Sequence, residues 1–196
     1  MIGVVCPSKF EYQFLDRAGL SRRAELVCAG MGKVRTAVAL HEMLMRRRLK
    51  GLLLIGFAGG LSRLKVGDMI EPGTFIEQDY DARPFEPFPN TLKKRHGRKL
   101  LARSLSAAML TQDRFLKENP YKNGPYAKKH PRLACDMESY AFAYFCERAK
   151  VPYSVVKFVS DSADGTADHD FLAACRRLAP ELSAVAKEAV IRLEKG

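Results

Sequence analysis

The chain has 196 residues, of which 47% are hydrophobic and 28% are charged. These values are ordinary for a globular protein, and the length predicts one domain over residues 1–196 that can bury a core. No apolar run approaches the roughly 20 residues that cross a bilayer, and Met1–Cys6 lacks the charged leader of a signal peptide. We therefore expect a cytoplasmic protein without membrane contact.

The net charge of +11 is the unusual feature of the composition, and it favours anionic partners. No nucleic-acid-binding module accompanies the charge, so we do not expect nucleic acid as a partner. The five cysteines form no Cys-x-x-Cys pair, and the four histidines do not flank them at zinc spacing. The expectation is free thiols, no metal and no cofactor.

The first predicted strand and helix carry one candidate acid. Residues 2–6 are an apolar, β-rich run, and Ser8 can cap a helix over 9–18. Glu11 lies in the first turn of that helix, just beyond the carboxyl end of the strand. The helix dipole favours an acid there, so Glu11 has a structural interpretation beside a functional one.

A glycine-rich turn follows the second predicted strand, 25–29. Gly30-Met31-Gly32-Lys33 joins this strand to an amphipathic helix over 34–48. Such a turn resembles a phosphate cradle, yet it is neither a Walker A loop nor a dinucleotide fingerprint. Glycines here equally permit close packing of the helix on the strand.

The apolar run 51–57 predicts a strand at the centre of a parallel sheet. It ends at Ala58, Gly59 and Gly60. The two glycines allow a flat ligand to approach the backbone, and they also suit a tight turn.

The middle of the chain has weaker signals. Strands are predicted at 66–70 and 74–78, around a turn at Pro72-Gly73. The proline-rich stretch 79–97 is predicted to be a loop, either a lid or a surface excursion. The remaining predictions are a short helix or linker at 98–105, a strand at 106–110 and a loop at 119–131.

Two acidic strand ends dominate the last third of the chain. A short run from Leu133 ends in Asp136-Met137-Glu138 before a helix over 139–150, and the apolar strand 154–161 ends in Ser160-Asp161. Ligands of open α/β sheets bind at the carboxyl ends of strands, so Glu138 and Asp161 are expected in one site. Each could instead be an ordinary acid at a helix start or cap.

Strands and helices alternate throughout, and a closing helix over 170–194 is predicted to be kinked or divided at Pro180. The alternation predicts an α/β fold with a mixed, largely parallel central sheet.

Seven motifs in order give the chain a resemblance to the nucleoside phosphorylase/nucleosidase superfamily, most of all to 5'-methylthioadenosine/S-adenosylhomocysteine nucleosidases. They are IGVVCPSKFE, AGMGKV, GFAGGLSRLKVGD, QDYD, TQDRFL, CDMESYAFA and VKFVSDSAD. The resemblance implies a three-layer α/β/α fold like that of purine nucleoside phosphorylase, trimmed near the N-terminus, and a homodimer. It further implies a purine nucleosidase that hydrolyses the N-glycosidic bond of an adenosine-type nucleoside.

The same resemblance implies roles for the acids. Asp161 matches the general acid at the leaving purine, with Ser160 positioning it, and Glu11 matches the base that activates water. Glu138 matches the carboxylate that holds the ribose hydroxyls, beside Met137. An acid at the leaving group and a base at the water is the chemistry of an inverting glycosidase.

The purine is expected to stack on Phe115, with the Leu116 backbone at its edge and Ala58 and Gly59 beneath the sugar and base. Phe57 departs from the family pattern, which has a small hydroxyl residue there near the ribose and, in phosphorylases, the phosphate. This favours water as the nucleophile.

Three alternatives stay open: a phosphorylase, a futalosine hydrolase, and a catalytically weak nucleoside-binding relative. Gln78 and Asp79 stand where the family usually has His-Asp. Functional and structural interpretations have equal weight for three further acids, Asp79, Asp81 and Asp113.

Overall fold

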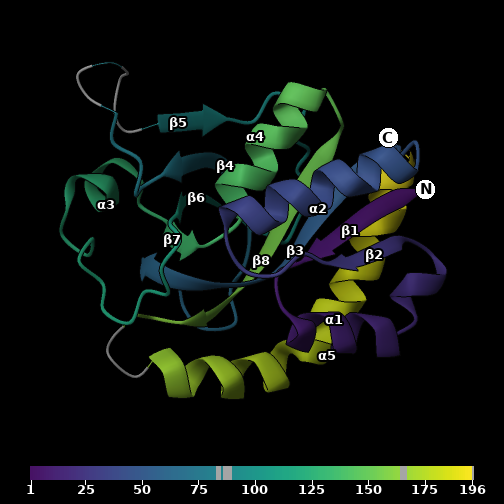
Figure 1. The fold of residues 1–196 in the computed structure, drawn as a ribbon. Coiled ribbons are helices and arrows are strands. Elements are labelled where there is room, and N and C mark those ends of the chain that lie inside the picture. The colour runs from purple at the N-terminus through teal and green to yellow at the C-terminus, as the bar shows by residue number, and fades with distance from the viewer. Residues whose placement is uncertain (83–84, 86–89, 164–166, 196) are drawn as a thin grey trace.

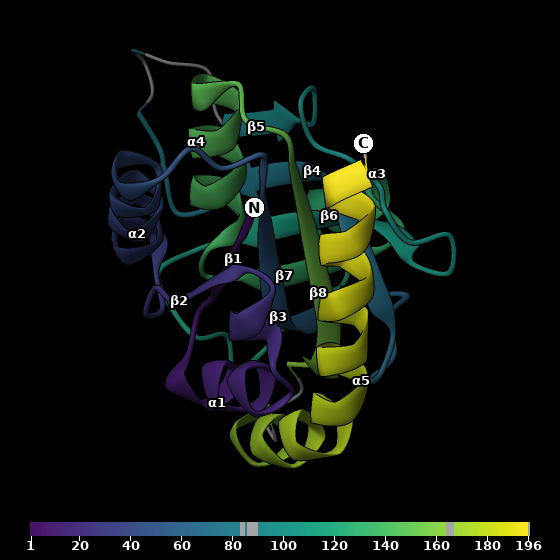
Figure 2. The ribbon, with the colours of Figure 1, turned by 90° about the vertical axis from the view of Figure 1, so that its right-hand side faces the viewer.

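A computed structural model describes residues 1–82, 85, 90–163 and 167–195. Its helices lie on both faces of an eight-stranded sheet, with α1 and α5 on one face and α2 and α4 on the other (Figures 1 and 2). The strands are β1 (Ile2–Cys6), β2 (Glu25–Cys28), β3 (Gly51–Ser62), β4 (Met69–Glu77), β5 (Asn90–Lys93), β6 (Leu105–Thr111), β7 (Leu133–Asp136) and β8 (Tyr153–Asp161). The α-helices are α1 (Lys9–Arg17), α2 (Lys33–Arg46), α3 (Pro125–Lys129), α4 (Ser139–Ala149) and α5 (Ala167–Lys195).

The sheet confirms the predicted mixed, largely parallel α/β architecture. Parallel pairs join β1 to β2 and β3, β3 to β8, and β6 to β4 and β7. Antiparallel pairs join β3 to β7 and β4 to β5 and β8. The pairings β3–β7–β6–β4–β8–β3 close a ring, so five strands surround a common interior beside the open β1–β2 edge.

Two apolar layers fix the helices on the sheet. Leu53 and Val156 belong to the layer that packs against α1 and α5, and Leu54 and Val155 belong to the layer under α2 and α4. Adjacent strand residues face opposite sides, so continuous apolar stretches such as LLLI in β3 and Val155-Val156 in β8 contribute side chains to both layers. No helix within the described ranges is both long and apolar enough to cross a bilayer.

Several predicted boundaries were wrong. The prediction of separate strands at 66–70 and 74–78 fails because β4 runs through Pro72 and Gly73, with a register shift against β6 between Pro72 and Thr74 that absorbs the missing N–H. The interpretation of Gly59-Gly60 as a tight turn also fails. Strand β3 continues through both glycines to pair with β7.

Other differences are shorter elements inside predicted loops. The loop predicted at 119–131 contains the one-turn helix α3, and the loop predicted at 79–97 contains the edge strand β5. Residues 98–104 are a linker. Pro84, Pro87 and Pro89 of the predicted lid lie outside the described residues. Helix α5 is continuous through Pro180 and bends along its length (Figure 1).

Candidate active site

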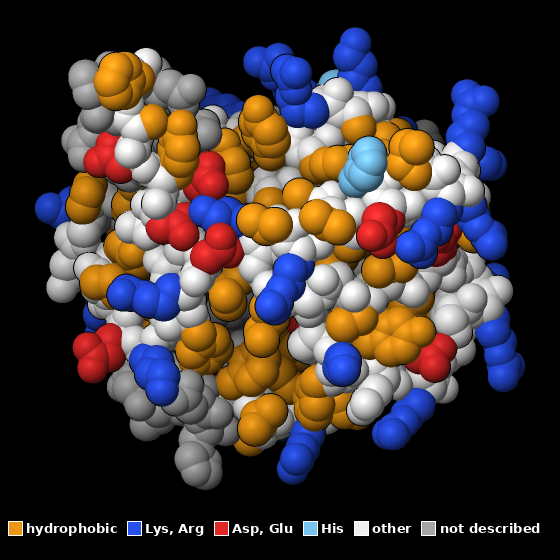
Figure 3. All heavy atoms as spheres, in the orientation of Figure 1, with side chains coloured by type: hydrophobic (Ala, Val, Ile, Leu, Met, Phe, Trp, Pro, Cys, Tyr) orange, Lys and Arg blue, Asp and Glu red, His pale blue; other side chains and the backbone are white. Residues whose placement is uncertain are grey.

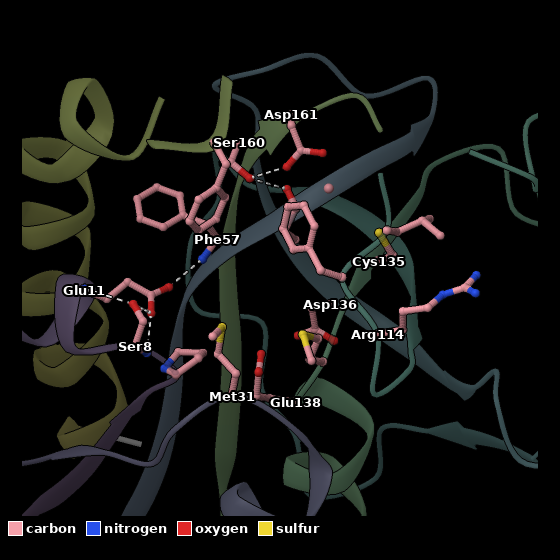
Figure 4. A pocket seen from close by; sticks show the side chains of 17 residues that line it. Ser8, Glu11, Met31, Phe57, Arg114, Cys135, Asp136, Glu138, Ser160 and Asp161 are labelled. Atoms are coloured by element: carbon pink, nitrogen blue, oxygen red, sulfur yellow. Dashed lines mark hydrogen bonds between the residues drawn. The ribbon is translucent and has the colours of Figure 1, made fainter. Parts of the chain in front are cut away.

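All nine residues proposed from the sequence line one cavity of about 390 Å³ at the strand ends. They are Glu11, Ala58, Gly59, Phe115, Leu116, Met137, Glu138, Ser160 and Asp161. The carboxylates of Glu11, Glu138 and Asp161 approach the cavity from different sides (Figure 4). Segments that are far apart in the sequence therefore meet at one place.

Glu11 is both a helix-capping residue and a cavity residue. Its Oε2 accepts hydrogen bonds from the backbone N–H and the hydroxyl of Ser8, at 2.8 and 2.7 Å, in a capping box that starts α1. Its Oε1 accepts the backbone N–H of Phe57 at 3.1 Å. Burial raises the pKa of Glu11, while Lys157 and these hydrogen bonds oppose the rise. A buried carboxylate with a raised pKa suits a general base.

Gly56 makes room for this carboxylate. A Cβ on Gly56 would collide with Oε1 of Glu11. The glycine in the middle of β3 therefore has a packing reason, which the apolar pattern of the strand did not reveal.

A register shift in β8 brings Ser160 and Asp161 to the same cavity. Val159 pairs with Ala58 and Asp161 pairs with Gly59, so Ser160 is the extra residue of a bulge. In a regular strand two successive side chains would point to opposite faces. Here the Ser160 hydroxyl donates to Oδ2 of Asp161 at 2.8 Å (Figure 4).

Asp161 is nearly fully buried and has a second local partner. Its Oδ1 accepts the backbone N–H of Ala163 at 3.1 Å. Close by, a Cβ on Gly59 would lie 3.1 Å from Oδ1 of Asp161 and 3.0 Å from Sγ of Cys135. The glycine thus permits the carboxylate and the thiol to flank the same stretch of β3.

Glu138 stands at the N-cap position of α4 without capping it. The capping bonds come from Asp136, whose carboxylate accepts the backbone N–H of Ser139 at 3.1 Å and also the Ser139 hydroxyl. Oε1 of Glu138 instead accepts the backbone N–H of Gly32 at 3.0 Å. The structural role at this helix start therefore belongs to Asp136, and Glu138 is available to the cavity.

Lys157 was not among the residues predicted from the sequence. It is fully buried, and its Nζ lies 3.0 Å from Oδ2 of Asp136 and 3.4 Å from Oε2 of Glu138. Burial lowers the pKa of Lys157, but Asp136, Glu138 and Glu11 more than offset this and raise it. The available signal was a single charge inside the otherwise apolar run SVVKFV, which predicts a buried ion pair.

An aromatic wall completes the cavity. The rings of Phe57 and Phe171 meet edge to face with centroids 6.2 Å apart, and those of Phe115 and Phe171 do so at 5.9 Å. Met31 and Arg114 also line the cavity. Phe171, Met31 and Arg114 were not among the predicted site residues, because a single apolar or basic residue on a helix or loop carries no signal of its own.

The arrangement combines four buried carboxylates, those of Glu11, Asp136, Glu138 and Asp161, with an apolar, aromatic wall. Such a cavity can bind a flat base against the wall and a polyhydroxyl group at a carboxylate. Within the described residues, no group of three or more His, Cys, Asp or Glu side chains is arranged to hold a metal ion.

Comparisons with known proteins bear on the family and the fold. A family model of the phosphorylase superfamily matches residues 20–191. A 5'-methylthioadenosine/S-adenosylhomocysteine nucleosidase of Buchnera aphidicola subsp. Acyrthosiphon pisum is 27% identical over 164 residues, which cover 74% of this chain and 70% of the relative.

Two solved structures show the same fold at low identity. A 5'-methylthioadenosine/S-adenosyl homocysteine nucleosidase of Helicobacter pylori is 18% identical with a TM-score of 0.81, and the match covers 97% of each chain. The futalosine hydrolase of H. pylori strain 26695 is 18% identical with a TM-score of 0.80, covering 97% of this chain and 96% of the other.

Proposed function

Because the chain belongs to the phosphorylase superfamily, we propose that it is a nucleosidase that hydrolyses the N-glycosidic bond of an adenosine-type nucleoside. The products are the free purine and the ribose moiety, and the substrates resemble 5'-methylthioadenosine or S-adenosylhomocysteine. The observation that carries the proposal is the meeting of Glu11, Glu138 and Asp161 at one aromatic-walled cavity. The named relative supports the substrate class.

The proposed reaction assigns each carboxylate one task. Asp161, positioned by Ser160, gives a proton to N7 of the purine as the C1'–N9 bond breaks and its electron pair leaves with the base. Glu11 takes a proton from water, whose oxygen then bonds to C1'. Glu138 accepts hydrogen bonds from the ribose hydroxyls. The purine stacks against Phe115, with the Leu116 backbone at its edge.

Water is the proposed nucleophile rather than phosphate. The N-terminus of α2 would be the natural phosphate site of the glycine-rich turn, but two of its donors already bind carboxylates: the N–H of Gly32 binds Glu138 and the N–H of Lys33 binds Asp113. The buried carboxylates of Glu11 and Glu138 would also repel a phosphate dianion. Both observations support hydrolysis over phosphorolysis.

A homodimer is part of the proposal. Helix α2 exposes Val34, Val38 and Met45 on one face, and Tyr144 of α4 is also exposed. Hydrophobic side chains gather on the face that these two helices cover (Figure 3). Such a face is typical of an interface with a second copy, and sedimentation equilibrium tests it. We also propose one cytoplasmic domain, because the five free thiols suit a reducing compartment.

A product assay tests the function. Purified protein is incubated with adenosine, 5'-methylthioadenosine, S-adenosylhomocysteine and futalosine, with and without phosphate, and free base and sugar are separated chromatographically. The proposal expects free base and free sugar at a rate that phosphate does not change. Ribose 1-phosphate would establish a phosphorylase, and binding without base release would establish a nucleoside-binding relative. Base release from futalosine alone would make the chain a futalosine hydrolase.

A further inference from the structure

The glycine-rich turn before α2 joins the two halves of the proposed site. We propose that Lys33 is a positioning residue that sets the purine-binding segment 114–116 against the sugar carboxylate Glu138. This inference rests on the proposed function. It assigns a role to the Gly-Met-Gly-Lys turn and to Asp79 and Asp113.

The backbone of the turn makes the first two connections. Gly32 donates its N–H to Oε1 of Glu138 at 3.0 Å, and Lys33 donates its N–H to Oδ1 of Asp113 at 2.8 Å. Two consecutive donors at the start of a 14-residue helix thus bind carboxylates from two different parts of the site. Met31, next to them, lines the cavity.

The Lys33 side chain makes the remaining connections. Its Nζ lies 2.6 Å from Oδ1 of Asp79, 2.9 Å from Oε1 of Glu77 and 4.0 Å from Oδ2 of Asp113. Asp79 in turn accepts the backbone N–H of Asp113 at 2.8 Å through its Oδ2. One ammonium therefore holds the end of β4, the residues after it, and the chain just before Arg114.

The charges of this cluster make Lys33 necessary. Its side chain is only 17% exposed, and three carboxylates surround it. Burial lowers the pKa of Lys33, but hydrogen bonds to Asp79 and Glu77 outweigh this and raise it, so the cation is strongly held. Without it, Glu77, Asp79 and Asp113 would repel one another. The segment after Asp113 would move away from Glu138.

The position of this segment matters because Phe115 and Leu116 follow Asp113 after a single residue, Arg114. In the proposed reaction these residues hold the purine while Glu138 holds the ribose. The distance between the two subsites decides whether the glycosidic bond lies against Asp161. Misplacement of about 1 Å at a reacting centre can cost on the order of a hundredfold in rate.

The test compares Lys33→Met, Lys33→Arg and Asp113→Ala with Arg46→Met. Arg46 is at the far end of α2 in an exposed pair with Glu42, so its variant is a matched control on the same helix. Calorimetry measures adenine binding, and steady-state kinetics with 5'-methylthioadenosine gives kcat and KM. Mass spectrometry follows hydrogen exchange over residues 111–116.

Lys33→Met is expected to weaken adenine binding about tenfold, to lower kcat/KM tenfold to a hundredfold, and to speed exchange in 111–116. Lys33→Arg should retain most of the wild-type adenine affinity, kcat/KM and protection from exchange. Arg46→Met should match the wild type in all three. Asp113 is 43% exposed, so Asp113→Ala is expected to fold. If Lys33→Met does not fold, Asp113→Ala decides whether the cluster positions the segment.

Unchanged adenine binding and exchange in Lys33→Met, or in Asp113→Ala, would overturn the positioning role while leaving the nucleosidase proposal intact. If the wild type released no purine, the nucleosidase proposal would fail instead. The exchange and adenine measurements would then still decide whether Lys33 positions the segment.

Discussion

The Nζ of Lys157 lies 3.0 Å from Oδ2 of Asp136, and both side chains are buried. The same ammonium lies 3.4 Å from Oε2 of Glu138, which lines the cavity. A helix-capping carboxylate and a proposed sugar-binding carboxylate therefore share one cation. The charge balance of the site depends on a residue that does not itself line the cavity.

Lys157→Met is expected to lower the free energy of unfolding by about 3–5 kcal/mol, because two carboxylates lose their buried partner. Urea denaturation measures this, with Lys9→Met at an exposed position as the control. Adding Asp136→Asn to Lys157→Met should recover part of the stability. Equal stability of Lys157→Met and wild type would show that the pair contributes little.

Nucleoside binding should depend on pH through Glu138. Burial and the charges of Asp136 and Glu11 raise the pKa of Glu138 to about 7, against the opposing effect of Lys157. The ionised carboxylate is the form that accepts two hydroxyl hydrogen bonds. The affinity for an adenosine analogue with a carbon–carbon glycosidic bond should therefore fall as the pH drops below 7. In Glu138→Gln the affinity should be weak and independent of pH.

The same pKa has a consequence for stability. A carboxyl whose folded pKa exceeds its unfolded pKa binds its proton more tightly in the native state. The stability that Glu138 contributes is therefore fully present below its unfolded pKa, near 4.5, and is lost as the pH rises through its folded pKa of about 7. The free energies of unfolding of the wild type and of Glu138→Gln should therefore diverge across this pH window. Parallel curves of stability against pH would contradict the raised pKa of Glu138.

Asp161→Asn is expected to reduce kcat by roughly 10²–10⁴-fold with little change in stability. The amide keeps the size of the side chain. Its oxygen can accept the Ala163 N–H while its NH2 donates to the Ser160 hydroxyl, which can donate to the Ala58 carbonyl, but the amide cannot transfer a proton to the purine. Purine release measures the effect, and Asp16→Asn, at the exposed end of α1, is the control. Full activity in Asp161→Asn would remove this residue from the reaction.

Two variants separate the roles of Glu11. Glu11→Gln retains an oxygen for the helix cap but loses the base, so kcat should fall by about 10²-fold or more. Its amide group would face the Phe57 N–H, which should cost about 1–3 kcal/mol of stability. Ser8→Ala removes a capping hydroxyl and should cost about 1 kcal/mol of stability. If Glu11→Gln turned over normally, the residue would be a capping residue only.

Gly56→Ala should impair both folding and turnover. The added methyl group would collide with Oε1 of Glu11 and force the carboxylate out of its hydrogen bond to Phe57. We expect a loss of about 1–3 kcal/mol in stability and a lower kcat. Gly73→Ala is the matched control, because a Cβ there meets nothing within 4 Å. Comparable losses in both variants would point to a general effect on the sheet.

The sequence predicted the fold and most cavity residues because both follow from order along the chain. Polar strand ends are local signals that singled out Glu138 and Asp161. Phe115, Leu116, Met137 and Ser160 were expected from the resemblance of the ordered motifs to a known family, and all nine expected residues line one cavity. The bulge at Ser160 and the space at Gly56 were not predictable, since each depends on a neighbouring strand. Lys157 and the cluster around Lys33 required knowledge of which distant carboxylates would arrive beside them.

The closed ring of strands also bears on how the molecule folds. Strand β8 fits between β3 and β4, which precede it in the chain by many residues, and it carries Lys157, Ser160 and Asp161. Pairing between strands so distant in sequence forms slowly, because closing the long loop between them lowers the chain entropy before the stabilising contacts form. During synthesis the ring cannot close until residues 153–161 have emerged. We therefore expect the strands at the N-terminus to gain protection first and the cavity to be completed in the last step of folding.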